Sequence, residues 1–63
     1  MDEAIAKTLE MLRDRMDYYD FQLADAERLG QNTYAAFLTG LRAGLSDAYH
    51  TLEDNVNAAS ASK

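Results

Sequence analysis

The stretch IAKTLEMLRDRMDYYDFQLADA, residues 5–26, decides the fold of this chain. Its apolar side chains recur in alternating steps of four and three, at Ile5, Leu9, Leu12, Met16, Tyr19, Leu23 and Ala26. This spacing places side chains on one face of an α-helix and is typical of helices that pack lengthwise against one another. The stretch therefore predicts a helix with one face buried along its length.

Residues that favour helix ends stand on either side of this stretch. Asp2 can accept a hydrogen bond from a free backbone N–H of the first turn, and Gly30 can adopt the positive φ that often follows a helix. We therefore expect a first helix over residues 3–29, a turn over 30–32 and a second helix over 33–57. Residues 58–63 are small and polar and predict a flexible C-terminal tail.

The second predicted helix carries its own apolar stripe, made of Tyr34, Leu38, Leu41, Leu45, Ala48 and Leu52, with Phe37, Tyr49 and Val56 beside it. A rival interpretation is one unbroken helix in a long coiled coil. Extending the first stripe past Ala26 would then place Gly40, Gly44 and Asp47 in the core, which argues against it. Because short links favour antiparallel neighbours, the sequence predicts an all-α, antiparallel two-helix hairpin.

Two helices alone enclose only one side of each stripe. Ordering the backbone costs about 1–2 kcal/mol per residue, and a core this small offsets that cost poorly. We therefore expect a homodimer that forms a four-helix bundle, which resembles bundles of the Rop type in length and layout only. The predicted core and dimer residues are Leu9, Leu12, Met16, Tyr19, Leu23, Leu38, Gly40, Leu41, Gly44, Leu45 and Leu52.

Gly40 and Gly44 form a G-x-x-x-G step inside the second helix. Each glycine destabilises a helix interior, so two of them suggest that close packing at these positions offsets the loss. We expect another helix, or a bulky side chain such as Met11 or Tyr18, to approach this strip closely. The alternative is an exposed helix that the glycines simply weaken.

Composition excludes several classes of function. The chain has 63 residues with eleven Asp and Glu, six Lys and Arg, and a net charge of −5. Nucleic acids and anionic membranes attract the opposite charge, so we expect neither as a partner. Charges recur throughout, which argues against a membrane span and favours a cytoplasmic protein. With one His and no Cys, the chain offers little for catalysis, and we expect no enzyme activity and no cofactor.

His50 stands between two acids in the pattern D-x-x-H-x-x-x-D, formed with Asp47 and Asp54. A bundle metal site would need these side chains to project into the core. His50 lies nearly opposite the stripe of Leu41, Leu45 and Leu52, so we expect no metal site.

Phe21 points away from the first apolar stripe and has acids around it. An exposed aromatic with a polar rim is typical of interaction hot spots. The predicted partner-binding residues are Asp14, Asp17, Tyr18, Phe21 and Asp25. The alternative is that Phe21 is an ordinary exposed residue or packs in the homodimer.

The sequence thus predicts a small acidic protein–protein interaction or regulatory module. A more specific version of this prediction is an inhibitor of the phage or mobile-element type that binds a basic protein surface. One alternative is a nucleic-acid-binding hairpin dimer of the Rop type, which needs its cations, Lys7, Arg13, Arg15, Arg28 and Arg42, on one face. The other is a purely structural oligomerisation module.

Overall fold

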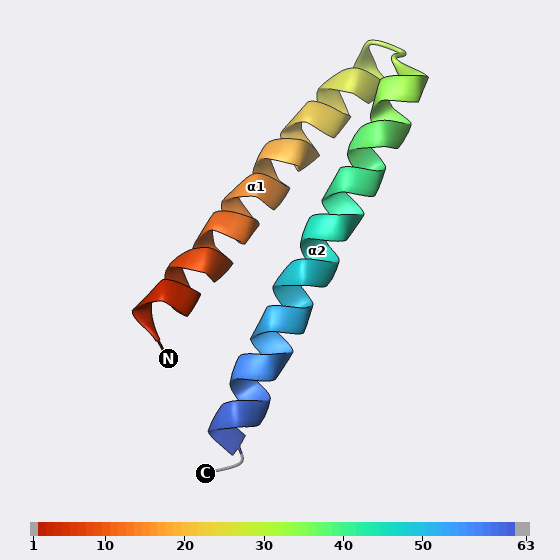
Figure 1. Cartoon of the computed structure of the whole chain (residues 1–63). Coiled ribbons are helices and arrows are strands. Elements are labelled where there is room, and N and C mark those ends of the chain that lie inside the picture. The colour runs from red at the N-terminus through yellow and green to blue at the C-terminus, as the bar shows by residue number, and fades with distance from the viewer. Residues whose placement is uncertain (1, 62–63) are drawn as a thin grey trace.

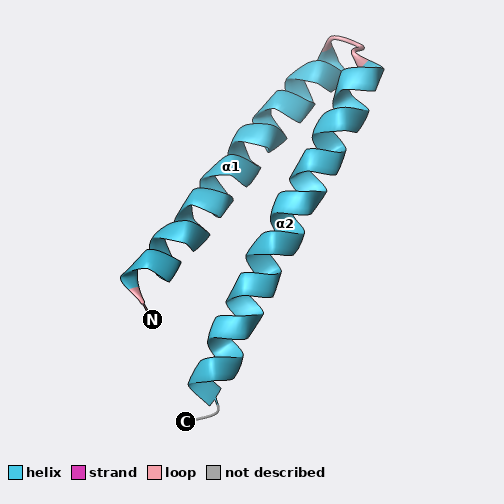
Figure 2. Ribbon diagram, viewed as in Figure 1, coloured by secondary structure: helices cyan, strands magenta, loops and turns pink. Residues whose placement is uncertain are grey.

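The computed structural model describes residues 2–61 and places them in two helices, α1 (Glu3–Arg28) and α2 (Asn32–Ala61). The helices run antiparallel, so the two ends of the described chain lie at the end of the molecule opposite the turn (Figure 1). Apart from the N-terminal cap and the turn, the described residues are helical (Figure 2). The predicted all-α hairpin is confirmed.

Both ends of α1 have the expected caps. The Asp2 carboxylate accepts a 2.7 Å hydrogen bond from the backbone N–H of Ala4. At the other end Gly30 has a φ of 73°, which suits glycine because it carries no Cβ. The N–H of Gly30 donates to the carbonyl of Glu27, and that of Gln31 donates to the carbonyl of Ala26. This pair of bonds is the Schellman motif, and it turns the chain back onto α1.

The second helix is longer than its sequence predicted. It begins at Asn32 and continues to Ala61, through residues that we assigned to the tail 58–63. Residues 57–61 include three alanines and neither Gly nor Pro, so the chain contains no stop signal there and good helix formers extend the helix. Residues 62 and 63 lie outside the described part of the chain.

The first apolar stripe faces α2 as predicted. Leu9 and Met16 pack with Tyr49 in one buried cluster, and Ala26 packs with Ala35 and Leu38 in a second cluster near the turn. The other stripe residues of α1, Ile5, Leu12, Tyr19 and Leu23, are partly buried against these clusters. Leu38 is the most deeply covered large side chain, with 1% of its surface exposed.

The stripe of α2 is rotated from its predicted position. Leu38, Leu45 and Leu52 face α1, together with Ala35 and Tyr49. Three other members of the predicted stripe, Tyr34, Leu41 and Ala48, are exposed. The apolar arc of α2 is wider than one neighbouring helix can cover, so part of it remains on the surface.

Candidate interaction surfaces

One side of the hairpin, which we call the polar face, is closed by hydrogen bonds between the helices. It is defined by Arg13 and Asp20 of α1 and by Arg42 and Tyr49 of α2. The guanidinium of Arg42 donates a 2.8 Å hydrogen bond to the Asp20 carboxylate and also lies 3.3 Å from the sulfur of Met16. These contacts join residues more than twenty positions apart and link the two helices on this side.

Arg13 makes the second link across the polar face. It donates a 2.7 Å hydrogen bond to the Tyr49 hydroxyl, and its guanidinium lies 5.6 Å from the centre of that ring. The hydrogen bond from Arg13 to Tyr49 raises the pKa of Arg13, and the nearby carboxylates of Glu53 and Asp17 act in the same direction. A shallow hollow beside this contact is lined by Ala6, Leu9, Glu10, Arg13, Tyr49 and Glu53. Arg13 therefore remains a cation whose head is held in place.

The opposite side of the hairpin, which we call the apolar face, is uncovered. Its large side chains are Met11 (66% exposed), Tyr18 (48%), Leu29 (53%), Tyr34 (46%), Phe37 (60%) and Leu41 (37%). On α1, Tyr18 lies about 200° around the helix axis from Asp20, and on α2, Leu41 lies about 100° from Arg42. In each helix the buried stripe lies between the two residues, so the apolar face and the polar face are on opposite sides of the hairpin. The rings of Tyr34 and Phe37 stack at 6.3 Å.

Charge is nearly absent from the apolar face. Arg15 lies on it, with its guanidinium 4.8 Å from the centre of the Tyr18 ring and 5.1 Å from that of Tyr19. By helical spacing, the Asp and Glu residues of the described chain lie at the rim of this face or beyond it. A net charge of −5 therefore does not prevent another protein surface from covering it.

A third surface, the outer face of α1, carries Phe21 and the acids predicted around it. Phe21 is 71% exposed and points away from α2, as its position opposite the stripe predicts. Asp14, Asp17 and Asp25 share this side of the helix. Asp25 is paired with Arg28 at 2.6 Å. Tyr18 lies between this surface and the apolar face, where its ring meets Tyr19 edge-on at 5.4 Å.

The glycines of α2 are open rather than packed. Within the described chain, a Cβ added at Gly40 or Gly44 would meet no side chain within 4 Å. The expected approach of Met11 or Tyr18 to this strip is therefore wrong for the single chain, because both side chains stay exposed on α1. Contact of the strip with a helix of another chain stays a prediction.

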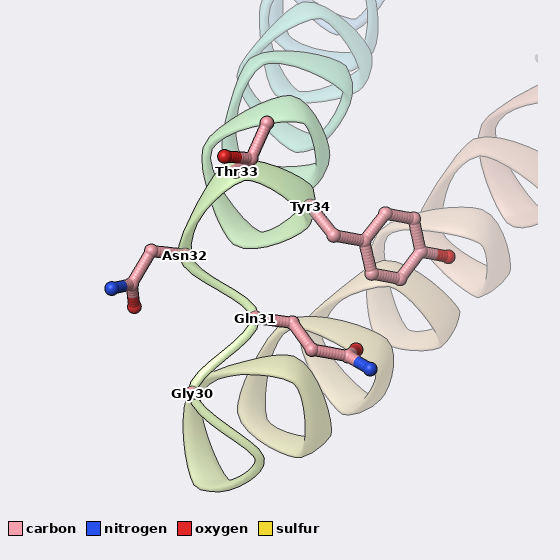
Figure 3. Close-up of a pocket in the computed structure, with 5 residues that line it drawn as sticks. All are labelled: Gly30, Gln31, Asn32, Thr33 and Tyr34. Carbon is pink, nitrogen blue, oxygen red and sulfur yellow. The ribbon is translucent and has the colours of Figure 1, made fainter.

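The remaining polar groups form no enclosed site in residues 2–61. His50 is exposed and lies 3.9 Å from Glu53, a residue that the sequence pattern did not single out. Groups of three or more metal-ligating side chains do not occur among the described residues. An open hollow at the turn is lined by Gly30, Gln31, Asn32, Thr33 and Tyr34, with Gln31 and Tyr34 pointing to one side and Asn32 to the other (Figure 3). Because these five residues are consecutive and exposed, the hollow reflects the shape of the turn and is not an enclosed site.

Neither helix, within the described residues, has the length and apolar character that crossing a membrane requires. Comparisons with protein-family models, with curated proteins and with solved structures find no match to this chain.

Proposed function

We propose that the protein is a protein–protein interaction module that works as a homodimer. The apolar face of each hairpin packs against a second copy and completes a four-helix bundle. The outer face of α1, with Phe21 among acids, then binds a protein partner with a basic surface. The observation that carries this proposal is the uneven division of the surface, with a polar face linked internally and an apolar face left open.

The size and shape of the single chain support pairing. A compact monomer of 7.0 kDa would expose about 4,000 Å², whereas this chain exposes 4656 Å². Its radius of gyration is 14.7 Å, against about 11 Å for a compact chain of this length. The hairpin is a slab of 50 × 16 × 11 Å that is only one helix thick. A second slab on the apolar face would bury large side chains and supply the missing half of a core.

The outer face of α1 would remain free in such a bundle. Phe21 lies on the side of α1 away from α2 and away from the apolar face, so pairing through that face leaves it exposed. A rigid aromatic surrounded by carboxylates suits a partner with an apolar pocket and basic groups at its edge. Long-range attraction from a chain of net charge −5 would speed the encounter with such a partner.

The positions of the arginines favour this function over nucleic-acid binding. Arg13 and Arg42 lie on the polar face, Arg28 pairs with Asp25 on the outer face, and Arg15 lies on the apolar face. A phosphate backbone needs several cations on one side. The described arginines are distributed over three sides, and two of them already have a carboxylate partner.

Affinity capture with matched variants tests the partner surface. Tagged wild type, Phe21→Ala and a doubly neutralised Asp14→Asn/Asp17→Asn variant are used as bait in lysate of the source cell, and captured proteins are quantified by mass spectrometry. We expect a protein retained by wild type to be lost with Phe21→Ala, although the melting temperature stays unchanged. The neutralised variant should bind more weakly at low salt and more nearly like wild type at high salt, because salt screens exposed charges.

Equal capture by wild type and Phe21→Ala would contradict the partner surface. The dimer would then stand alone, and the protein would be a structural oligomerisation module. Retention of nucleic acid at low salt by all three baits would contradict the assignment to protein partners.

A further inference from the structure

We propose a specific arrangement for the pairing of two copies, which rests on the homodimer proposed above. α2 of one copy lies antiparallel on α2 of the other, about a two-fold axis that passes beside Leu41. Each Phe37 then packs into the hollow at Gly44 of the partner copy.

The sizes of the side chains along α2 carry this inference. The exposed stripe of α2 consists of Tyr34, Phe37, Leu41, Gly44 and Ala48, in steps of three and four. Its N-terminal half is large and its C-terminal half is small. When the stripe is reversed onto itself around Leu41, Tyr34 faces Ala48 and the two copies of Leu41 meet. Phe37 then lies within one residue, about 1.5 Å along the axis, of Gly44. A surface that is complementary to itself in this way is what a two-fold dimer requires.

Gly44 leaves a gap on the surface of α2 that a side chain of another copy can fill. It is exposed, and apart from its chain neighbours and the backbone of its own helix, no atom of the described chain lies within 4 Å of the place where its Cβ would be. Glycine weakens the interior of a helix, and the single chain shows no contact that requires it there. Phe37, seven residues earlier on the same side of the helix, leaves 60% of its surface in solvent. A partner helix running the other way brings these two features together.

The first helix supports the same axis independently. The contact between Asp20 and Arg42 shows that position 20 of α1 lies level with position 42 of α2, next to Leu41. An axis at the level of Leu41 crosses α1 at position 21, so with α1 over α1 of the partner copy it pairs positions of α1 whose numbers are centred near 21. To within two residues, or about 3 Å, Met11 then lies level with Leu29, Tyr18 with Gln22, and Arg15 with Asp25. Met11 and Leu29 are both apolar, Tyr18 meets the polar Gln22, and the cation Arg15 meets the acid Asp25, although these pairs were not used to choose the axis.

Other alignments of the two hairpins fit less well. Parallel α2 helices would place Phe37 on Phe37 and Gly44 on Gly44, which leaves one crowded position and one void. Placing α1 of one copy over α2 of the other would hold the two copies of Leu41 apart on opposite edges of the interface. The position of Leu41 distinguishes the proposed arrangement from the one with α1 over α2, and the pairing of Phe37 with Gly44 distinguishes it from the parallel one.

Cysteine cross-linking tests the axis, because the chain contains no natural cysteine. Leu41→Cys is compared with His50→Cys, which places a more exposed thiol on α2 away from the apolar face. Sedimentation equilibrium of the reduced proteins first gives their masses. On mild oxidation we expect Leu41→Cys to form a covalent dimer about tenfold or more faster than His50→Cys, because a disulfide needs Cβ atoms about 4 Å apart. A mixture of Phe37→Cys and Gly44→Cys should cross-link more readily than either variant alone.

The outcomes separate this inference from the proposed function. If the wild-type chain is a dimer but Leu41→Cys cross-links no faster than His50→Cys, the arrangement is wrong and the homodimer stands. If the wild-type chain sediments as a monomer at every concentration, both are wrong.

An exchange of the large and small residues provides a second test. Gly44→Phe fills the hollow in both copies, and we expect the dissociation constant of the dimer to rise about a hundredfold. Phe37→Ala/Gly44→Phe exchanges the two positions and should bring the dissociation constant back to within about tenfold of wild type. Circular dichroism checks that both variants remain helical. A Gly44→Phe variant that dimerises like wild type, or a helical double variant that stays as weak as Gly44→Phe, would contradict the arrangement.

Discussion

Arg13 of α1 donates a 2.7 Å hydrogen bond to the hydroxyl of Tyr49 of α2, across 36 positions of sequence. The ring of Tyr49 is buried with Leu9 and Met16, so a core residue carries a polar tip to the surface. Together with the bond between Arg42 and Asp20, this contact covers one side of the hairpin with polar groups. Apart from Phe21 on the outer face of α1, the large apolar side chains that remain uncovered therefore lie on the other side.

Removing the Tyr49 hydroxyl should destabilise the fold only modestly. Tyr49→Phe keeps the buried ring and releases the exposed guanidinium of Arg13 to water, so we expect a small loss in the free energy of unfolding. Urea denaturation at a fixed protein concentration measures this change. An Arg13→Gln/Tyr49→Phe double variant that loses the sum of the two single effects would contradict a direct coupling.

Truncation of Leu38 and truncation of Leu41 should cause losses of stability that depend differently on protein concentration. Leu38 is 1% exposed, and Leu38→Ala should cost about 2–5 kcal/mol at any concentration, because it opens a cavity inside the hairpin. Leu41 is 37% exposed in the single chain, so Leu41→Ala should act mainly by weakening the dimer. Thermal melting over a range of dilutions separates the two effects. Identical concentration dependence for Leu41→Ala and wild type would count against a contact of Leu41 between copies.

Alanine at two of the glycines should have opposite effects. Gly30 has a φ of 73°, and Gly30→Ala should lower the free energy of unfolding by about 1 kcal/mol, because an L residue is strained there. Gly40 lies inside α2 with open space around its missing Cβ, so Gly40→Ala should raise the free energy of unfolding by about 0.5–1 kcal/mol. Paired melting curves test both changes. A loss of stability in Gly40→Ala would mean that a neighbour approaches this position closely.

The N-cap of α1 gives a local test of helix stability. Asp2→Ala removes the carboxylate that accepts from the N–H of Ala4, and it should cost about 1 kcal/mol. Asp2→Asn keeps an acceptor and serves as the matched control. If Asp2→Ala and Asp2→Asn melt at the same temperature, the side-chain hydrogen bond does not contribute measurably.

The sequence predicted α1 better than α2, for a physical reason. Seven apolar residues in strict alternation occupy a narrow arc on α1, so one neighbouring helix covers them all. The apolar arc of α2 is broader and includes both Leu38 and Leu41. Periodicity locates such an arc but does not tell which part of it the partner helix covers. The buried part depends on how the two helices are rotated against each other.

The polar links across the hairpin could not be predicted from the pattern. Arg13, Asp20, Arg42 and Tyr49 look like ordinary residues beside an apolar stripe, and they meet only once the alignment of the helices is known. Gly30 is the converse case. Its conformational requirement is local, and the structure gives it the positive φ that the sequence predicted. The partner surface around Phe21 stays a prediction, because exposure does not by itself identify a partner.

The mass of the wild-type protein in solution tests the central claim most directly. Sedimentation equilibrium from about 1 μM to about 1 mM covers the affinities of moderate to weak complexes. Our account predicts a mass of two chains over the upper part of this range, falling toward the 7.0 kDa of one chain only on dilution. A mass of 7.0 kDa at every concentration, from a protein with fully helical circular dichroism, would contradict it.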